Sequence, residues 1–303
     1  MASTLTRDAP LCSDVRSDPH GEPLAGTAKR GEVYVLFEWP GGWSRDVLDG
    51  GTFGPELSAR LKRFFKGTAS LQLIRRPGRA GRDVGHKHRC YLVWARTARM
   101  ELVLLDAPED LLRLDLTGPG RNGGEEITAP VVLVCTHGRR DRCCAIKGRP
   151  LAARLQEEFP GSLIWESSHT KGHRFAPAVL LMPWGYSFGH LNIEAARDLT
   201  RHALDGRYFY PANRGSGLYG SRGQVAELHV ARMLIDAGET LHYGDLTTDD
   251  APEGSVAVRH RDGRAWAVPL TRRTVEGVVA SCGGSPKAAK VWVPDLSGDE
   301  EPA

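Results

Sequence analysis

The sequence predicts an α/β fold made of two successive β-α-β-β-β-α units, followed by a small α+β module. Short apolar runs typical of buried strands alternate with helical periodicity, and this order of elements occurs twice along the chain. A Gly-rich stretch at residues 207–225 has the composition of a linker and separates the last helix and hairpin from the rest. The predicted divisions are an irregular leader at 1–30, units at 31–125 and 126–210, and the module at 221–295.

Composition and charge indicate a globular protein of about two domains. The 303 residues are 41% hydrophobic, and 40 Lys and Arg against 37 Asp and Glu give no general argument for nucleic acid or an anionic membrane as partner. No apolar run approaches the ~20 residues that span a bilayer, and the acidic N-terminus lacks the apolar core of a signal peptide. Six cysteines are too few for a disulfide scaffold. We therefore expect a cytoplasmic protein with free or metal-bound thiols.

The first unit is predicted from its apolar patterning. Apolar residues at helical spacing mark one face of a helix, and four runs have the composition of strands. The helix face contains Leu57, Leu61, Phe64 and Phe65, and the strands cover residues 32–39, 70–75, 90–95 and 100–107. A short helix opens at Pro108. A parallel β-α-β crossover followed by a hairpin and a closing helix is the order of a thioredoxin-like unit.

The second unit repeats this order from Val131. The strands are predicted at residues 131–135, 162–167, 178–184 and 186–191, with Leu151, Leu155 and Phe159 on the helix between the first two. Asn192 caps the closing helix, which Gly206 ends. Because the two copies share little sequence identity, a single larger α/β sheet is the alternative interpretation.

The C-terminal module is predicted to be one helix and one hairpin. The helix covers residues 226–238 and ends at Gly238. The hairpin covers residues 255–270 and turns at Asp262-Gly263.

The second unit contains two separated pairs of candidate metal ligands. Cys135 ends the first strand of the unit, and Cys144 lies nine positions later. His169 and His173 follow the second strand, within the run HTKGH. Loops that follow neighbouring parallel strands leave the same edge of the sheet, where such folds place their ligand sites. We therefore expect the two pairs to converge.

Two cysteines and two histidines can hold either a tetrahedral Zn²⁺ or a [2Fe–2S] cluster in which imidazoles replace two thiolates on one iron. Structural zinc usually takes its cysteines from a tight C-x2–4-C knuckle. Eight residues separate Cys135 from Cys144, which favours the cluster. Spacing alone leaves both groups open.

The run CTHGRRDRCC and, after the next strand, the run HTKGHRFAPAVLLMPWG resemble the sucrase/ferredoxin-like family, also described as thioredoxin-like ferredoxins. The segments CSDVRSDPHGEPLAGTA and SCGG are also similar to its bacterial members. The resemblance implies a thioredoxin-like ferredoxin fold and a non-Rieske [2Fe–2S] cluster bound through a Cys pair and an H-x3-H pair. In the family pattern C-[ST]-H-x-x-R-D-x-x-C, the ligating cysteines correspond to Cys135 and Cys144, and the histidines to His169 and His173. Ala145 stands here where the family usually has Gly.

Several neighbouring residues leave alternatives open. Cys143 is a spectator thiol, the ligand in place of Cys144, or a redox-active partner of Cys144. The segment 139–142 is predicted as a polar loop, which either stabilises an anionic cluster or is a solvated turn held by Arg140 and Asp141. His137 lies in the same loop as an outer hydrogen-bond donor or a surface residue. Cys12, Cys90 and Cys282 are assigned no role beyond packing. These assignments are made from position in the sequence alone.

The first unit is predicted to be degenerate, because Glu38-Trp39-Pro40 stands where the second unit has its first cysteine. It therefore cannot build the same site.

The resemblance and the ligand set together lead us to expect an electron-transfer or redox-sensing protein with proton-coupled one-electron chemistry. Its partner would be an unidentified redox protein acting as donor or acceptor, which the exposed Lys171 could meet if that protein is acidic. A zinc-stabilised binding module is one alternative. A thiol–disulfide oxidoreductase using Cys143 and Cys144 is another, although the chain lacks a C-x-x-C motif there. No motif nominates the carboxylate pair that glycoside hydrolysis by a sucrase needs.

Overall fold

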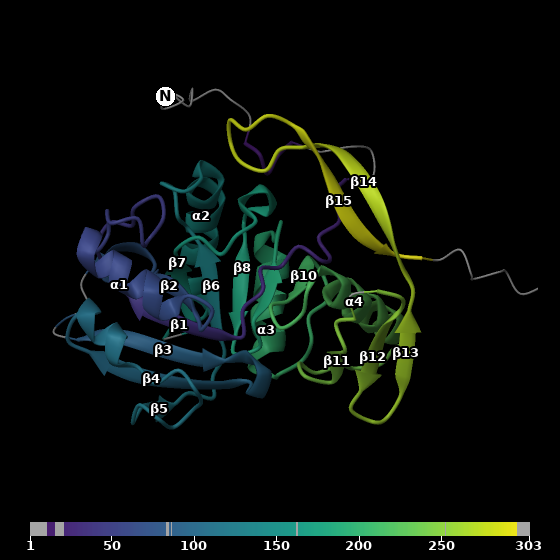
Figure 1. The fold of residues 1–303 in the computed structure, drawn as a ribbon, viewed down its shortest axis with the longest axis horizontal. Helices are drawn as coiled ribbons and strands as arrows, with labels where there is room; N and C mark the ends of the chain where they lie inside the picture. Colours follow the sequence, from purple (N-terminus) through teal and green to yellow (C-terminus); the bar gives the residue numbers. More distant parts are fainter. Residues whose placement is uncertain are drawn as a thin grey trace, which may run out of the picture.

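The centre of the computed structural model is one mixed β-sheet (Figure 1). The structure describes residues 11–15, 21–82, 85, 87–161, 163–251 and 253–295. Over these residues the sheet has ten strands in the order β10-β9-β8-β6-β7-β2-β1-β3-β4-β5. The predicted α/β class is confirmed.

The first half of the sheet follows the predicted order of elements. Its main elements are β1 (Val33–Glu38), α1 (Pro55–Phe65), β2 (Ser70–Arg75), β3 (His88–Trp94) and β4 (Arg99–Leu105). Short 3-10 helices at Gly78–Arg82, Ala95–Thr97 and Pro108–Arg113 and the two-residue strand β5 (Glu125–Glu126) complete it. Strand β1 pairs with β2 in parallel and with β3 antiparallel, so α1 forms the crossover between parallel neighbours.

The second half has the same topology. Its elements are β6 (Val131–Cys135), α2 (Arg142–Glu158), β7 (Ile164–Ser167), a 3-10 turn (His173–Phe175), β8 (Val179–Met182), β9 (Tyr186–Phe188) and α3 (Ile193–Leu204). The order β7-β6-β8-β9, with only β6 and β7 parallel, repeats the order β2-β1-β3-β4. The side chain of Asn192 accepts from the backbone N–H of Ala195 at 2.8 Å, as a cap for α3.

The two halves join through β2 and β7, which pair antiparallel at Ile74–Ser167 and Arg75–Glu166. The result is a single continuous sheet in which each half has a strand order consistent with a thioredoxin-like unit. That the halves are two tandem units, the first degenerate, stays a prediction.

Three apolar clusters hold the layers together. Helices α2, α3 and α4 cover one side of the second half, and α1 covers one side of the first half. The sheet faces that these helices do not cover contribute side chains from both halves to a third cluster. Its members include Tyr34, Leu36, Tyr91, Leu133, Trp165 and Met182. Strands such as β6 are therefore buried on both faces, which explains their continuous apolar sequence.

The linker predicted at 207–225 is wrong. Residues Asn213–Ser216 form the buried edge strand β10 on β9, and α4 (Ser221–Asp236) begins inside the predicted linker. The glycines there serve close packing: a Cβ on Gly215, at φ 117°, would lie 2.6 Å from the side chain of Gln224 on α4. Glycine at such a contact has the same sequence signature as a flexible connection.

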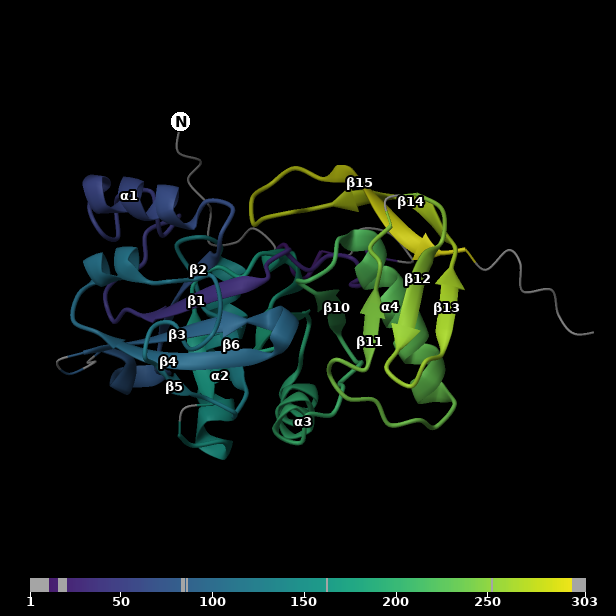
Figure 2. The same cartoon turned by 60° about the horizontal axis from the view of Figure 1, so that its bottom comes forward.

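The C-terminal part consists of α4, a small sheet and a ribbon (Figure 2). The sheet contains β11 (Leu246–Thr248), β12 (Val256–His260) and β13 (Ala265–Val268), and α4 packs between it and β10. Strands β14 (Leu270–Val278) and β15 (Lys287–Pro294) form the ribbon, drawn in yellow in Figure 1, whose connecting loop reaches back to the start of α2. Among the described residues, no helix has the length and apolarity needed to cross a bilayer.

Helix α4 places one carboxyl group, Glu227, in the fully buried core. The phenol groups of Tyr186 and Tyr208 both donate to its Oε1 atom. Burial nevertheless raises the pKa of Glu227 to about 7, against the opposing effect of these two hydrogen bonds.

This raised pKa predicts a pH-dependent stability. Between its usual pKa of 4.5 and about 7, Glu227 binds more protons in the folded than in the unfolded chain, so the free energy of unfolding falls as pH rises. The fall amounts to about 3 kcal/mol and levels off above pH ~7. Urea unfolding at a series of pH values should show a flatter profile for Glu227→Gln than for wild type. Glu253→Gln, on an exposed loop, is the control, and an unchanged profile in Glu227→Gln would contradict the prediction.

Candidate metal centre

The four predicted ligands lie at one edge of the sheet. Cys135 is the last residue of β6 and Cys144 lies in the first turn of α2. His169 follows β7, and His173 begins the 3-10 turn before β8. Strands β6 and β7 are parallel and Cys135 is in register with Ser167, so both loops leave the same end of the sheet.

Donor atoms of Cys135, Cys144 and His169 lie within 4.8 Å of one another. His173 is outside this group of three but beside it, because its Nδ1 atom is 3.4 Å from Nε2 of His169. Both cysteines are fully buried, and both histidines are partly exposed. The structure thus brings three of the predicted ligands together and places the fourth next to His169. That they bind a metal stays a prediction.

Two ring nitrogens of this group lack a hydrogen-bond partner in the described structure. The atoms are Nδ1 of His169 and Nε2 of His173, and both are buried. A buried polar atom without a partner destabilises a fold by about 1–3 kcal/mol. Two such nitrogens beside two buried thiols form a donor set that a metal ion or cluster would satisfy, so the residues fit both groups that their spacing leaves open.

The electrostatics of the site favour the ligating forms of Cys135 and His173, but not of Cys144. The neighbouring thiol of Cys144, and then His169, hold the pKa of Cys135 well below its usual value, whereas the contact with Cys135 and burial raise the pKa of Cys144. Burial lowers the pKa of His173 to about 4. At neutral pH its imidazole is therefore uncharged, which is the form that binds a metal.

Asp141 determines the direction of the first turn of α2. The polar loop is predicted to run through residue 142, but α2 begins at Arg142. The buried carboxylate of Asp141 caps this helix by accepting from the backbone N–H of Cys143 at 3.0 Å. The predicted alternative of a solvated turn is therefore wrong for Asp141. Oδ2 of Asp141 also lies 3.6 Å from Nε2 of His173.

His137 positions His169. It is buried, so it is not a surface residue. Its Nδ1 accepts the backbone N–H of His169 at 3.2 Å, which leaves the proton on Nε2 to donate to the carbonyl of Ser44 at 2.8 Å. His137 thereby links the site to a loop of the first half of the sheet.

Cys143 faces away from Cys135. Its sulfur lies 3.1 Å from the sulfur of Cys282 and 3.5 Å from that of Cys12. Sequence reasoning assigned no role to Cys12 and Cys282, because no local signal indicates that residues 270 positions apart meet.

The corresponding point of the first half contains no thiol. Strand β1 ends at Glu38, a buried carboxylate that accepts from the backbone N–H and the guanidinium of Arg89 at 3.2 and 3.3 Å. Trp39 follows it and stacks on Phe37. This end of the first half is occupied by an ion pair and by aromatic packing that includes the ring of His88.

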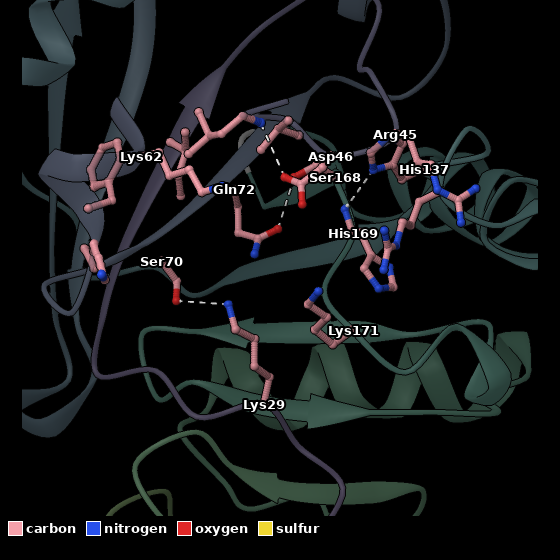
Figure 3. Close-up of a pocket in the computed structure, with 17 residues that line it drawn as sticks. Lys29, Arg45, Asp46, Lys62, Ser70, Gln72, His137, Ser168, His169 and Lys171 are labelled. Atoms are coloured by element: carbon pink, nitrogen blue, oxygen red, sulfur yellow. Dashed lines mark hydrogen bonds between the residues drawn. The ribbon is translucent and has the colours of Figure 1, made fainter. Parts of the chain in front are cut away.

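A cavity of about 410 Å³ opens beside the site (Figure 3). His137 and His169 form part of its wall, and Ser168 donates to Gln72 across its floor at 3.2 Å. Its charged lining is one aspartate, Asp46, and six basic residues: Lys29, Arg45, Lys62, Lys66, Arg140 and Lys171. The cavity is therefore electropositive.

A comparison with models of protein families found a match. A family model described as sucrase/ferredoxin-like matches residues 24–215. This range contains the ten-stranded sheet up to Gly215 and all four candidate ligands, and it leaves out Cys12 and Cys282. Searches of curated proteins and of solved structures found no match.

The close approach of α2 to the end of β6 predicts the effect of one substitution. A Cβ on Gly148 would lie 2.1 Å from the carbonyl oxygen of Cys135. Gly148→Ala should therefore lower the free energy of unfolding by about 1–3 kcal/mol, as overpacking does. Because the displaced carbonyl belongs to a predicted ligand, the substitution should also lower the predicted metal content. Urea unfolding and elemental analysis measure the two effects, with the exposed neighbour Arg149→Ala as the control. Stabilisation by about 1 kcal/mol, the usual result of Gly→Ala in a helix, would contradict this packing constraint.

Proposed function

The chain belongs to the sucrase/ferredoxin-like family, and we propose that it binds one [2Fe–2S] cluster through Cys135, Cys144, His169 and His173 and transfers single electrons, as a carrier or a redox sensor. The observation that carries the proposal is the donor set itself. Two fully buried thiols and two imidazoles with unsatisfied buried nitrogens lie at one sheet edge.

The arrangement of the donors supports a cluster with two different ends. Cys135 and Cys144 lie in the protein interior, whereas His169 lines the electropositive cavity and the side chain of His173 is 13% exposed. Thiolates would hold the inner iron and imidazoles the outer one. Electrons would therefore enter and leave on the histidine side.

A [2Fe–2S] cluster, when bound, supplies reversible one-electron chemistry. The protein's own residues keep the donors in place and keep water from the sulfur ligands. His137 fixes the backbone at His169, and the cap at Asp141 fixes the turn that carries Cys144. That electron uptake is coupled to a proton stays a prediction of the sequence.

The same donors could hold a single zinc ion, and the 4.8 Å limit on the distances among Cys135, Cys144 and His169 is compatible with one. A zinc-stabilised binding module is therefore the second candidate function. The thiol–disulfide alternative loses support, because Cys143 and Cys144 belong to different side-chain groups.

We further propose that the redox partner presents an acidic surface to the cavity beside His169. Six basic side chains against one carboxylate produce a positive field there, which speeds the approach of an anion and is screened by salt. The exposed Lys171, two residues from His169, is one of the basic side chains that line this cavity.

Single substitutions test the ligand set. Cys135→Ser, Cys144→Ser, His169→Ala and His173→Ala should each lower cluster affinity by more than the roughly 10- to 100-fold that loss of an outer hydrogen-bond partner produces. Cys143→Ser should keep its iron, because that sulfur faces Cys12 and Cys282. The visible absorption and iron content of anaerobically purified protein measure the outcome. Bleaching by Cys143→Ser with retention of iron in Cys144→Ser would reverse the assignment of these two thiols.

Charge reversal tests the docking surface. Lys62 lines the cavity, whereas its neighbour Arg63 on α1 does not, and both are exposed. Lys62→Glu should slow the oxidation of the reduced protein by ferricyanide several-fold at low ionic strength, and the difference should shrink in salt. Arg63→Glu makes the same charge change and should have a smaller effect in stopped-flow measurements. Equal slowing by both variants would mean that net charge, and not the cavity, controls the reaction.

A further inference from the structure

We propose that Cys12, Cys143, Cys282 and Asp141 form a second metal site, separate from the cluster site, that binds one tetrahedral ion of the zinc type. Their donor atoms lie within 4.8 Å of one another, and all four residues are buried. The sulfur of Cys143 lies 3.1 Å from that of Cys282 and 3.5 Å from that of Cys12, and the remaining pair of sulfurs is 3.7 Å apart. The ligands come from the leader, the first turn of α2 and the loop between β14 and β15.

These distances fit a single ion better than an iron–sulfur cluster. Zinc–sulfur bonds of about 2.3 Å place the thiolates of a tetrahedral site about 3.8 Å apart. Two of the observed sulfur–sulfur distances, 3.5 and 3.7 Å, lie close to that value, and the third, 3.1 Å, is shorter. Thiolates on different irons of a cluster would be farther apart. Asp141 can supply the fourth ligand, because both its carboxylate oxygens lie 4.0 Å from the sulfur of Cys12.

The surroundings provide the hydrogen bonds that metal-bound thiolates and carboxylates need. The hydroxyl of Ser13 donates to the sulfur of Cys143 at 3.4 Å, and the backbone N–H of Cys12 donates to the sulfur of Cys282 at 3.4 Å. Asp141 accepts from the backbone N–H groups of Cys143 at 3.0 Å and Cys282 at 2.9 Å. The positive N-terminal end of α2 adds to the stabilisation of this anionic donor set.

Apolar packing alone does not explain why these three segments meet. Their shared cluster has four buried members, of which three are the cysteines and the fourth is Ala176. Among the residues that the structure describes, Leu11 and Val279 alone pack against it as partly buried apolar side chains. A metal bound by all three segments would attach the leader and the β14–β15 loop to the start of α2. Its binding energy would then contribute to folding, as that of a structural zinc does.

The experiment uses Co²⁺ as the probe, in a cluster-free background. In full-length Cys144→Ser, addition of Co²⁺ should produce thiolate-to-cobalt charge-transfer and tetrahedral d–d bands that saturate at about one ion per chain. Adding Cys12→Ser or Cys282→Ser to this background should abolish these bands, whereas adding Cys90→Ala, which removes a buried thiol of β3, should leave them unchanged. Cys12 lies in a segment without helix or strand, so its substitution tests the site if Cys282→Ser does not fold.

Three outcomes would overturn the proposal. They are the absence of tetrahedral cobalt bands, bands that persist without Cys12 or Cys282, and a mass that shows a disulfide between two of the three thiols. Elemental analysis of the wild type and of single variants distinguishes a failure of the second metal site from a failure of the proposed cluster. Cys12→Ser and Cys282→Ser should lose zinc and keep iron, and Cys144→Ser should lose iron and keep zinc. If neither the wild type nor any variant contains iron, the proposed cluster is contradicted and the proposed zinc site is not.

Discussion

The first turn of α2 is the constraint on which the chemistry of this protein depends. Asp141 caps the helix, and Gly148 allows the next turns to lie against the end of β6. Successive residues of an α-helix point about 100° apart, so the adjacent thiols of Cys143 and Cys144 face different neighbours. Cys144 joins Cys135 and the histidines, and Cys143 joins Cys12 and Cys282. One helix start thus contributes to two donor sets.

Asp141 connects these two groups. Its carboxylate accepts from the N–H groups of Cys143 and Cys282, and its Oδ2 atom lies 3.6 Å from Nε2 of His173. One short, buried side chain therefore contacts members of both groups. The solvent side of the cluster site is electropositive, because His169 lines a cavity whose charged residues are mainly lysine and arginine. Buried thiol donors and a positive entrance support the proposed exchange of electrons with an anionic partner.

Much of the fold follows from sequence patterns, because fully buried strands such as β6 and β8 require continuous apolar runs. Convergence of the Cys and His pairs also follows, since β-α-β topology brings the ends of parallel strands to one edge. Three features could not be predicted in this way. The strand Asn213–Ser216 contains no apolar side chain, and the cap at Asp141 lies within a polar run. The meeting of Cys12 with Cys282 depends on the path of the C-terminal ribbon, for which a single sequence gives no signal.

Pulsed EPR of the reduced protein, labelled with ¹⁵N only in histidine, tests the central claim most directly. The account predicts a rhombic signal of a reduced [2Fe–2S] cluster with hyperfine couplings from two histidine nitrogens, one of them lost in His169→Cys and the other in His173→Cys. A cluster signal without histidine couplings would contradict the ligand assignment. A colourless, EPR-silent protein that holds zinc at Cys135 and Cys144 would contradict the cluster itself.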